Sequence, residues 1–150
     1  MGQTLTNLIY RVVFSAKGRA PVIGPDRLVE LPLYIAKLVS ELGGRALTAN
    51  ATSDHVHLLI SLPPKVSLSD AVKFIKANSS RWASQRAPAA PAFARQAGYA
   101  AFSVSQTDAV RVRAYTDNQA AHHREFDYQA ELREILSAHD VEWDERQVWE

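Results

Sequence analysis

The chain has 150 residues, of which 47% are hydrophobic and 22% charged, and its formal net charge is +1. This composition is typical of one globular domain and excludes a disordered chain. No apolar run approaches the roughly 18–20 residues that span a bilayer, no secretion signal is seen, and the absence of cysteine excludes thiolate catalysis. We therefore expect a cytoplasmic protein with no membrane partner.

The charge is unevenly distributed along the chain. Residues 65–116 carry eight basic and two acidic side chains, a balance of +6, whereas residues 117–150 carry three basic and ten acidic, a balance of −7. A basic middle region suits nucleic acid, because Lys and Arg displace counterions from its phosphates. A set of solvated helix faces explains the same charges, so charge alone leaves both interpretations open.

The first half of the chain predicts one strand and one helix before a turn. Residues 8–14 are rich in β-branched and aromatic side chains and predict a strand. Helical spacing of apolar residues follows, and Pro32 fits best in the first turn, so the helix should begin near Leu31. Gly43-Gly44 is a strong helix stop.

The remaining elements complete a βαββαβ order. Strands are predicted at 45–51, 55–62 and 99–105, with helices at 68 to about 86, 107–126 and 129–138. This order predicts an α+β, ferredoxin-like sheet with helices on one face, plus a C-terminal helix. We expect a single domain over 1–150, with a body of about 1–105 followed by a helix and acidic tail over about 106–150.

Two histidines lie two residues apart in the predicted strand 55–62. Side chains alternate between the faces of a strand, so Val56 and Leu58 should face the core while His55 and His57 share the opposite face. Their α-carbons would be roughly 6–7 Å apart. Two imidazoles at this spacing can bind one divalent metal ion. Taken alone, a chance His-x-His on a half-exposed strand is the simpler interpretation.

A second polar stripe lies on the predicted helix 107–126. Tyr115 and Gln119 are separated by four residues and His122 by seven, so all three share one stripe. A phenol oxygen can attack phosphorus and form a covalent ester, and an amide oxygen is a neutral metal ligand. An ordinary amphipathic helix with Tyr115 at the edge of its apolar face is the alternative.

Together these motifs resemble the HUH-type single-tyrosine transposases of the insertion-sequence-200-like group, where HUH denotes His, a hydrophobic residue and His. The resemblance covers nearly the whole chain. It is carried by His55-Val56-His57, by Tyr115-Thr116-Asp117-Asn118-Gln119 followed by His122-His123, and by 13–19, 68–76 and 98–105.

The resemblance implies a DNA transposase that cleaves single-stranded DNA. His55, His57 and Gln119 would hold one divalent ion, Mg²⁺ or Mn²⁺, and Tyr115 would form a 5′-phosphotyrosine intermediate. His122 and His123 are candidate auxiliary residues, with exposed helix-end histidines as the alternative. Five basic residues are candidates for contacting the DNA backbone: Lys73, Lys76, Arg81, Arg111 and Arg113. The alternative is that they are solvated surface residues.

The resemblance also implies partners. Relatives recognise DNA hairpins at the ends of their elements, and they act as homodimers in which the tyrosine helix of one subunit completes the metal site of the other. Three positions depart from the family's pattern. Arg95 stands where many relatives carry Trp, and Ala100 stands where they often carry Gly. Arg11 stands at a polar position of the first strand where relatives often carry His. These departures bear on mobility and efficiency and leave the predicted metal and nucleophile positions intact.

Three alternatives remain at this point. A domesticated endonuclease would keep the chemistry and act on host repeats. A catalytically silent hairpin-binding protein would bind DNA without forming a covalent adduct. A ferredoxin-like metal-binding module would have no affinity for single-stranded DNA.

Overall fold

The computed structural model describes residues 2–15, 27–52, 55–86, 98–117 and 128–144. Four strands form one antiparallel sheet in the order β2-β3-β1-β4. The strands are β1 (Leu8–Ser15), β2 (Arg45–Ala51), β3 (His55–Leu62) and β4 (Ala100–Val104). This order and pairing confirm the predicted ferredoxin-like sheet.

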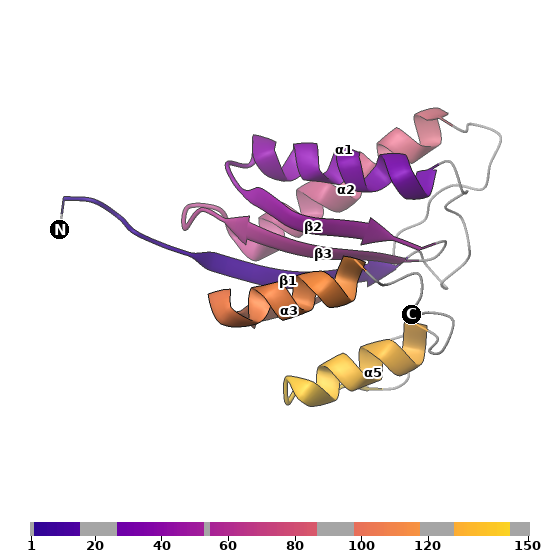
Figure 1. Ribbon diagram of the computed structural model, residues 1–150. Helices are drawn as coiled ribbons and strands as arrows, with labels where there is room; N and C mark the ends of the chain where they lie inside the picture. Colours follow the sequence, from indigo (N-terminus) through magenta and orange to yellow (C-terminus); the bar gives the residue numbers. More distant parts are fainter. Residues whose placement is uncertain (1, 16–26, 53–54, 87–97, 118–127, 145–150) are drawn as a thin grey trace.

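The helices lie on both sides of the sheet (Figure 1). Helices α1 (Arg27–Glu41) and α2 (Leu68–Arg86) cover the side that we call the upper face. Helices α3 (Gln106–Asp117) and α5 (Tyr128–Ala138) lie against the opposite side, the lower face. The predicted arrangement, helices on one face plus a C-terminal helical part, is therefore confirmed.

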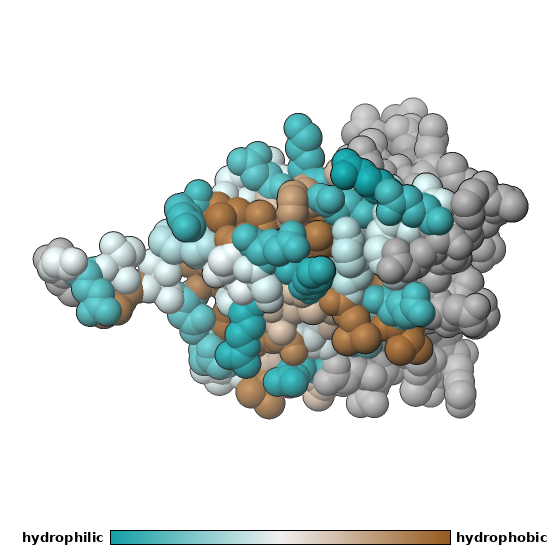
Figure 2. All heavy atoms as spheres, turned by 90° about the horizontal axis from the view of Figure 1, so that it is seen from above, coloured by the Kyte–Doolittle hydropathy of each residue, from teal (hydrophilic) through white to brown (hydrophobic). Residues whose placement is uncertain are grey.

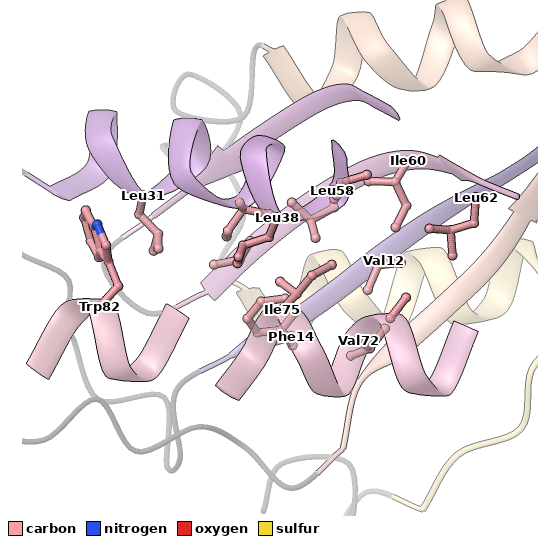
Figure 3. Close-up of a cluster of buried hydrophobic side chains, with 14 residues drawn as sticks. Val12, Phe14, Leu31, Leu38, Leu58, Ile60, Leu62, Val72, Ile75 and Trp82 are labelled. Atoms are coloured by element: carbon pink, nitrogen blue, oxygen red, sulfur yellow. The ribbon is translucent and has the colours of Figure 1, made fainter. Parts of the chain in front are cut away.

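The main hydrophobic core lies between the upper face and helices α1 and α2 (Figure 3). Residues at every second position of β3 point into it, as the alternation predicted, and so do Val12 and Phe14 of β1. Ile35 and Leu38 of α1 and Ile75 of α2 pack against them. Each such side chain contributes about 1.5–3 kcal/mol to folding, so this face accounts for much of the stability.

The lower face buries two smaller apolar clusters. Ala109 of α3 packs on Ile9 and Leu59. Three residues of α5, Leu132, Ile135 and Leu136, pack on Val13 and Phe102. Polar side chains occupy the rest of this sheet surface, between and beside the two clusters.

The first helix begins earlier than the sequence suggested. We predicted a start near Leu31, but α1 begins at Arg27 and Pro32 lies inside it. A proline within a helix costs about 3 kcal/mol. Burial of Leu31 and Ile35, at 1% and 0% exposure, is of the same size or larger, and it outweighs the lost hydrogen bond.

The predicted helix stop is confirmed at its glycines. Gly43 has a φ of +83°, a conformation that residues with a Cβ atom rarely adopt. The Gly44 amide donates to the Val39 carbonyl at 3.0 Å. A Cβ atom on Gly44 would meet the backbone oxygen of Ser61, so the chain passes close to β3 here. The stop therefore also sets the entry into β2.

Helices α2 and α3 each begin at a serine N-cap. The Ser67 hydroxyl accepts from the Asp70 amide at 3.1 Å, and the Ser105 hydroxyl accepts from the Asp108 amide at 3.1 Å. The described part of the predicted helix 107–126 ends at Asp117, and the rest of that prediction lies outside the described residues. None of the helices in the described ranges is long and apolar enough to cross a membrane.

The outer surface of α1 and α2 is mixed in character. Figure 2 views the molecule from above and shows hydrophobic atoms in separate areas among hydrophilic ones. Val29 and Leu33, each 70% exposed, belong to the apolar part of this surface. Scattered exposed apolar residues are ordinary on a soluble domain.

Candidate active site

The two histidines of β3 lie side by side on the lower face. His55 is 2% exposed and His57 is 1% exposed, and their ring centroids are 5.0 Å apart with the planes at 61°. Their neighbours Val56 and Leu58 point into the upper core instead. The predicted division of β3 between its two faces is therefore confirmed, but the strand is buried on both sides rather than half exposed.

The spacing of the two rings fits one shared metal ion. Metal–nitrogen bonds of about 2.1 Å put each ring centre about 3.3 Å from the ion. Two such bonds about 90–100° apart place the ring centres about 4.7–5.1 Å from each other. The observed 5.0 Å falls in this range. Imidazole nitrogens are good ligands for divalent transition-metal ions, Mn²⁺ included, so His55 and His57 suit such an ion.

Thr52 holds the ring of His55. Its Oγ1 lies 2.6 Å from His55 Nδ1 and 3.4 Å from the His55 carbonyl oxygen. If the hydroxyl donates to that carbonyl, it accepts a hydrogen bond from Nδ1–H, and the lone pair of His55 is then on Nε2. This arrangement sets the tautomer that a metal ligand needs. Thr52 falls between the predicted strands 45–51 and 55–62, and no role was predicted for it.

A β-bulge places further polar groups beside His57. The register of β2 shifts between Ala46 and Thr48, so that Thr48 pairs with Leu59 and Asn50 pairs with His57. Cross-strand partners lie on the same face, which puts Thr48 and Asn50 on the lower face. Asn50 Nδ2 donates to Thr48 Oγ1 at 3.3 Å. No local signal in the sequence identified this bulge.

The first strand brings Ser15 and Arg11 to the same face. Ser15 pairs with His55 and is 1% exposed, and Val13 pairs with His57. Arg11 pairs with Leu59 and Phe102 and is only 9% exposed. A guanidinium group this deeply buried keeps its charge, so the face that carries the imidazoles also carries a fixed positive charge.

The predicted nucleophile belongs to a helix of the same face. Tyr115 lies in the last turn of α3, which packs on β2 and β3 through Ala109 and Val112. The predicted Gln119, His122 and His123 lie outside the described residues. Within the part of the chain that the structure describes, no cluster of three or more His, Cys, Asp or Glu residues could hold a metal. A third protein ligand for an ion at the two histidines would therefore be an amide, a hydroxyl or a residue outside the described ranges.

The predicted DNA-contacting residues divide between the two sides of the sheet. Lys73, Lys76 and Arg81 belong to α2 above the sheet, whereas Arg111 and Arg113 belong to α3 below it. Both arginines of α3 are exposed, as are Lys73 and Arg81. The five basic residues therefore do not form one continuous patch.

Lys76 is the exception, because it is 5% exposed and has structural partners. Its Nζ donates to the Gly98 carbonyl at 3.0 Å and lies 5.8 Å from the centre of the Phe14 ring. These contacts connect α2 to the segment that precedes β4.

Comparison with known proteins identifies the family. The model of the family described as "Transposase IS200 like" matches residues 4–119, a range that includes both histidines of β3, Tyr115 and Gln119. The chain belongs to the IS200-like transposase family.

Individual relatives agree with this assignment. The transposases for insertion sequence element IS200 of Salmonella typhimurium and Salmonella typhi are each 30% identical over 80 residues. Each alignment covers 53% of this chain and 53% of the relative, so the chain matches about half the length of these curated relatives.

Two solved structures share the fold. A putative transposase from Deinococcus radiodurans R1 has a TM-score of 0.62 and 21% identity, over 77% of this chain and 93% of that one. A REP-associated tyrosine transposase bound to a REP hairpin has a TM-score of 0.62 and 12% identity, over 81% and 71% of the two chains. These likenesses establish the architecture of the IS200-like chain.

The three departures from the family's pattern differ in their placement. Arg95 lies outside the described residues. Ala100 is the first residue of β4 and pairs with Val13, so it is held in the sheet. Arg11 occupies the middle of the lower face, as described above. Of the two departures within the described residues, Arg11 is the one that adds a charge to the face that carries the histidines.

Proposed function

We propose that this IS200-like protein is a transposase that cleaves and rejoins single-stranded DNA, with Tyr115 as nucleophile and one divalent metal ion as cofactor. One observation carries the proposal. Two buried imidazoles with the spacing of a shared ion lie on the sheet face that is covered by the helix containing Tyr115.

His55, His57 and Gln119 would hold the ion, with Mg²⁺ or Mn²⁺ as the metal. When bound, the ion would polarise the scissile phosphate and offset the charge that develops in the transition state. Mn²⁺ accepts imidazole more readily than Mg²⁺ does, so both should support activity. Thr52 keeps His55 in the ligating tautomer, and Arg11 adds positive potential on the same face.

Tyr115 performs the covalent step in this proposal. Its phenol oxygen attacks phosphorus, the bond from phosphorus to the 3′-oxygen breaks, and the leaving oxygen takes up a proton as a 3′-hydroxyl. The phenol loses its proton to solvent or to His122 or His123, the auxiliary candidates. The resulting 5′-phosphotyrosine ester conserves the bond energy, so another 3′-hydroxyl can reverse the step and join new ends without ATP.

DNA binding would use both sides of the sheet. Arg111 and Arg113 lie on the helix that carries Tyr115 and would contact the DNA backbone on that side of the sheet. Lys73, Lys76 and Arg81 belong to the opposite side, where the two exposed side chains would contact DNA away from the reacting phosphate. The REP-associated relative was solved with a REP hairpin, and we propose that hairpin ends are the substrate here too. A homodimer that shares tyrosine helices between its subunits completes the proposal.

A covalent-adduct assay tests this function. Purified protein is mixed with single-stranded oligonucleotides copied from the DNA that flanks its gene, in Mn²⁺ or in EDTA, and is run on a denaturing gel. We expect a metal-dependent protein–DNA species that is absent with Tyr115→Phe. The matched control is Tyr99→Phe, because Tyr99 is 41% exposed and has no assigned role.

Other outcomes separate the alternatives. Hairpin binding by a folded protein that forms no adduct would favour a silent DNA-binding protein. An adduct that forms on host repeats, rather than on the ends of a mobile element, would favour a domesticated endonuclease. Metal affinity without DNA affinity would favour a metal-binding module outside DNA chemistry.

A further inference from the structure

A second polar pocket lies on the lower face, at the end of the sheet farthest from the histidines. It has a volume of about 210 Å³. Arg45 and Ser61, which pair across β2 and β3, line it together with Arg113 of α3. Asn7 and Gln106 line it as well, and Asn7 Nδ2 donates to Gln106 Oε1 at 2.9 Å. The pocket is therefore built from four separate parts of the chain.

Its position relative to the candidate metal site follows from the strand register. Ser61 pairs with Ile9 near the start of β1, whereas His55 pairs with Ser15 at its end. Ile9 is six positions from Ser15, the partner of His55, and four positions from Val13, the partner of His57, which is about 20 Å and about 13 Å along the strand. The pocket is thus distinct from the candidate metal site but lies along the same helix-covered face.

The two arginines that line the pocket give it positive charge, which suits an anion. Arg45 and Arg113 are 68 residues apart in the chain, and the fold brings both to one pocket. Among the described residues that line it there is no aspartate or glutamate. An anion between the two guanidinium groups would accept charge-assisted hydrogen bonds from both.

The remaining polar groups match the same ligand. The Ser61 hydroxyl is a donor, and Gln106 keeps its amide nitrogen as a donor while its oxygen accepts from Asn7. Guanidinium forks match the geometry of phosphate oxygens, and small donors complete such sites. Gln106 also begins α3, and the positive end of a helix dipole favours negative charge. Asp108 in the same turn does not line the pocket.

We propose that this pocket binds one phosphate group of the DNA strand, held by Arg45 and Arg113 together, and anchors that strand about 13–20 Å along the sheet from the two histidines. The inference rests on the proposed function for the identity of the ligand, but the anion site itself does not depend on catalysis. The contact is to a phosphate and not to a base, so it should not depend on DNA sequence.

The first test uses inorganic phosphate as the probe. Backbone amide NMR signals of Arg45, Ser61 and Gln106 should shift as phosphate is added to the full chain, and Arg45→Gln should abolish the shifts. Arg45 is exposed at the start of β2, so the variant should fold normally. Lys37→Gln, an exposed change on α1, is the matched control and should leave the shifts intact. Absence of any phosphate-dependent shift in the wild-type pocket would overturn the proposal.

The second test measures the affinity for single-stranded oligonucleotides at several salt concentrations. Arg45→Gln and Arg113→Gln should each weaken binding by about three- to tenfold on every sequence, and the double variant should lower the salt slope by about 0.7, the value for one lost phosphate contact. The double variant should also weaken binding by less than the product of the two single effects, because both arginines contact one phosphate. Unchanged affinity, or fully multiplicative effects, would contradict a shared phosphate site.

The two proposals fail separately. Tyr115→Phe should bind DNA normally in this assay while forming no adduct. Phosphate-dependent shifts in a protein that forms no adduct would retain the pocket and remove the strand-transfer function. If both arginine variants bind DNA normally and form the metal-dependent adduct, the strand-transfer function is supported and the phosphate pocket is contradicted.

Discussion

The two faces of the sheet are buried in different ways. The upper face is covered by α1 and α2 and buries mainly apolar side chains, with Lys76 and Ser79 of α2 as buried polar ones. The lower face is covered by α3 and α5 and buries Arg11, Ser15, Thr48, His55 and His57 among its apolar clusters. Buried polar groups lower stability unless they have partners, so they are expected where they serve a purpose. The comparison teaches that one face carries most of the apolar packing, while the other carries the buried polar residues of the proposed active site.

Leu58 and His57 are adjacent residues of β3, each 1% exposed, on opposite faces. Leu58→Ala should give the largest effect of the set, a loss of about 2–5 kcal/mol in the free energy of unfolding, because it leaves a cavity in the upper core. Urea unfolding followed by circular dichroism would measure it. Below its unfolding midpoint the variant should still form the DNA adduct, and an adduct lost in fully folded protein would break the division between faces.

A change at the neighbouring residue His57 should lower adduct formation and leave the free energy of unfolding nearly unchanged. His57→Leu should lower metal-dependent adduct formation by at least about a hundredfold, because it removes a proposed metal ligand. Its free energy of unfolding should change by no more than about 1 kcal/mol, since an apolar side chain replaces a buried polar one of similar size. Adduct yield and urea unfolding on the same preparation would provide both numbers. A stability loss as large as that of Leu58→Ala would make His57 a core residue instead.

Thr52→Val sharpens the comparison within the lower face. The change keeps the shape of the side chain but removes the hydroxyl that holds His55 Nδ1. Affinity for Mn²⁺, measured by calorimetry without DNA, should fall by about 10–100-fold. Thr48→Val is the matched control, because Thr48 lies on β2, four residues before Thr52, and its hydroxyl accepts from Asn50 instead. Equal losses in both variants would show that Thr52 has no particular role toward His55.

The two serine caps should give the smallest effects. Ser67→Ala and Ser105→Ala each remove one hydrogen bond to the helix start, worth about 1 kcal/mol. The loss at Ser67 should appear in global unfolding, because α2 is part of the main core. The loss at Ser105 should appear mainly as faster amide hydrogen exchange in α3 and a lower adduct yield. Indistinguishable exchange patterns in the two variants would argue against separate roles for these helices.

Much of this protein was determined by its sequence alone. Alternation in β3 divided Val56 and Leu58 from His55 and His57, Gly43-Gly44 ended α1, and Ser67 began α2. Each of these features depends on residues only a few positions apart, which is the range over which periodicity and capping act. The motifs also indicated the family correctly, because their order and separation are linear properties.

Other features were decided only by the tertiary structure. The burial of Leu31 extended α1 past Pro32, and the bulge in β2 placed Asn50 opposite His57. Packing of the helices on opposite sides of the sheet separated the basic residues of α2 from those of α3, and it joined Arg45 to Arg113 in one pocket. The physical reason is the same in each case. Register, bulges and helix packing depend on contacts between residues far apart in the chain, and local patterns do not specify such contacts.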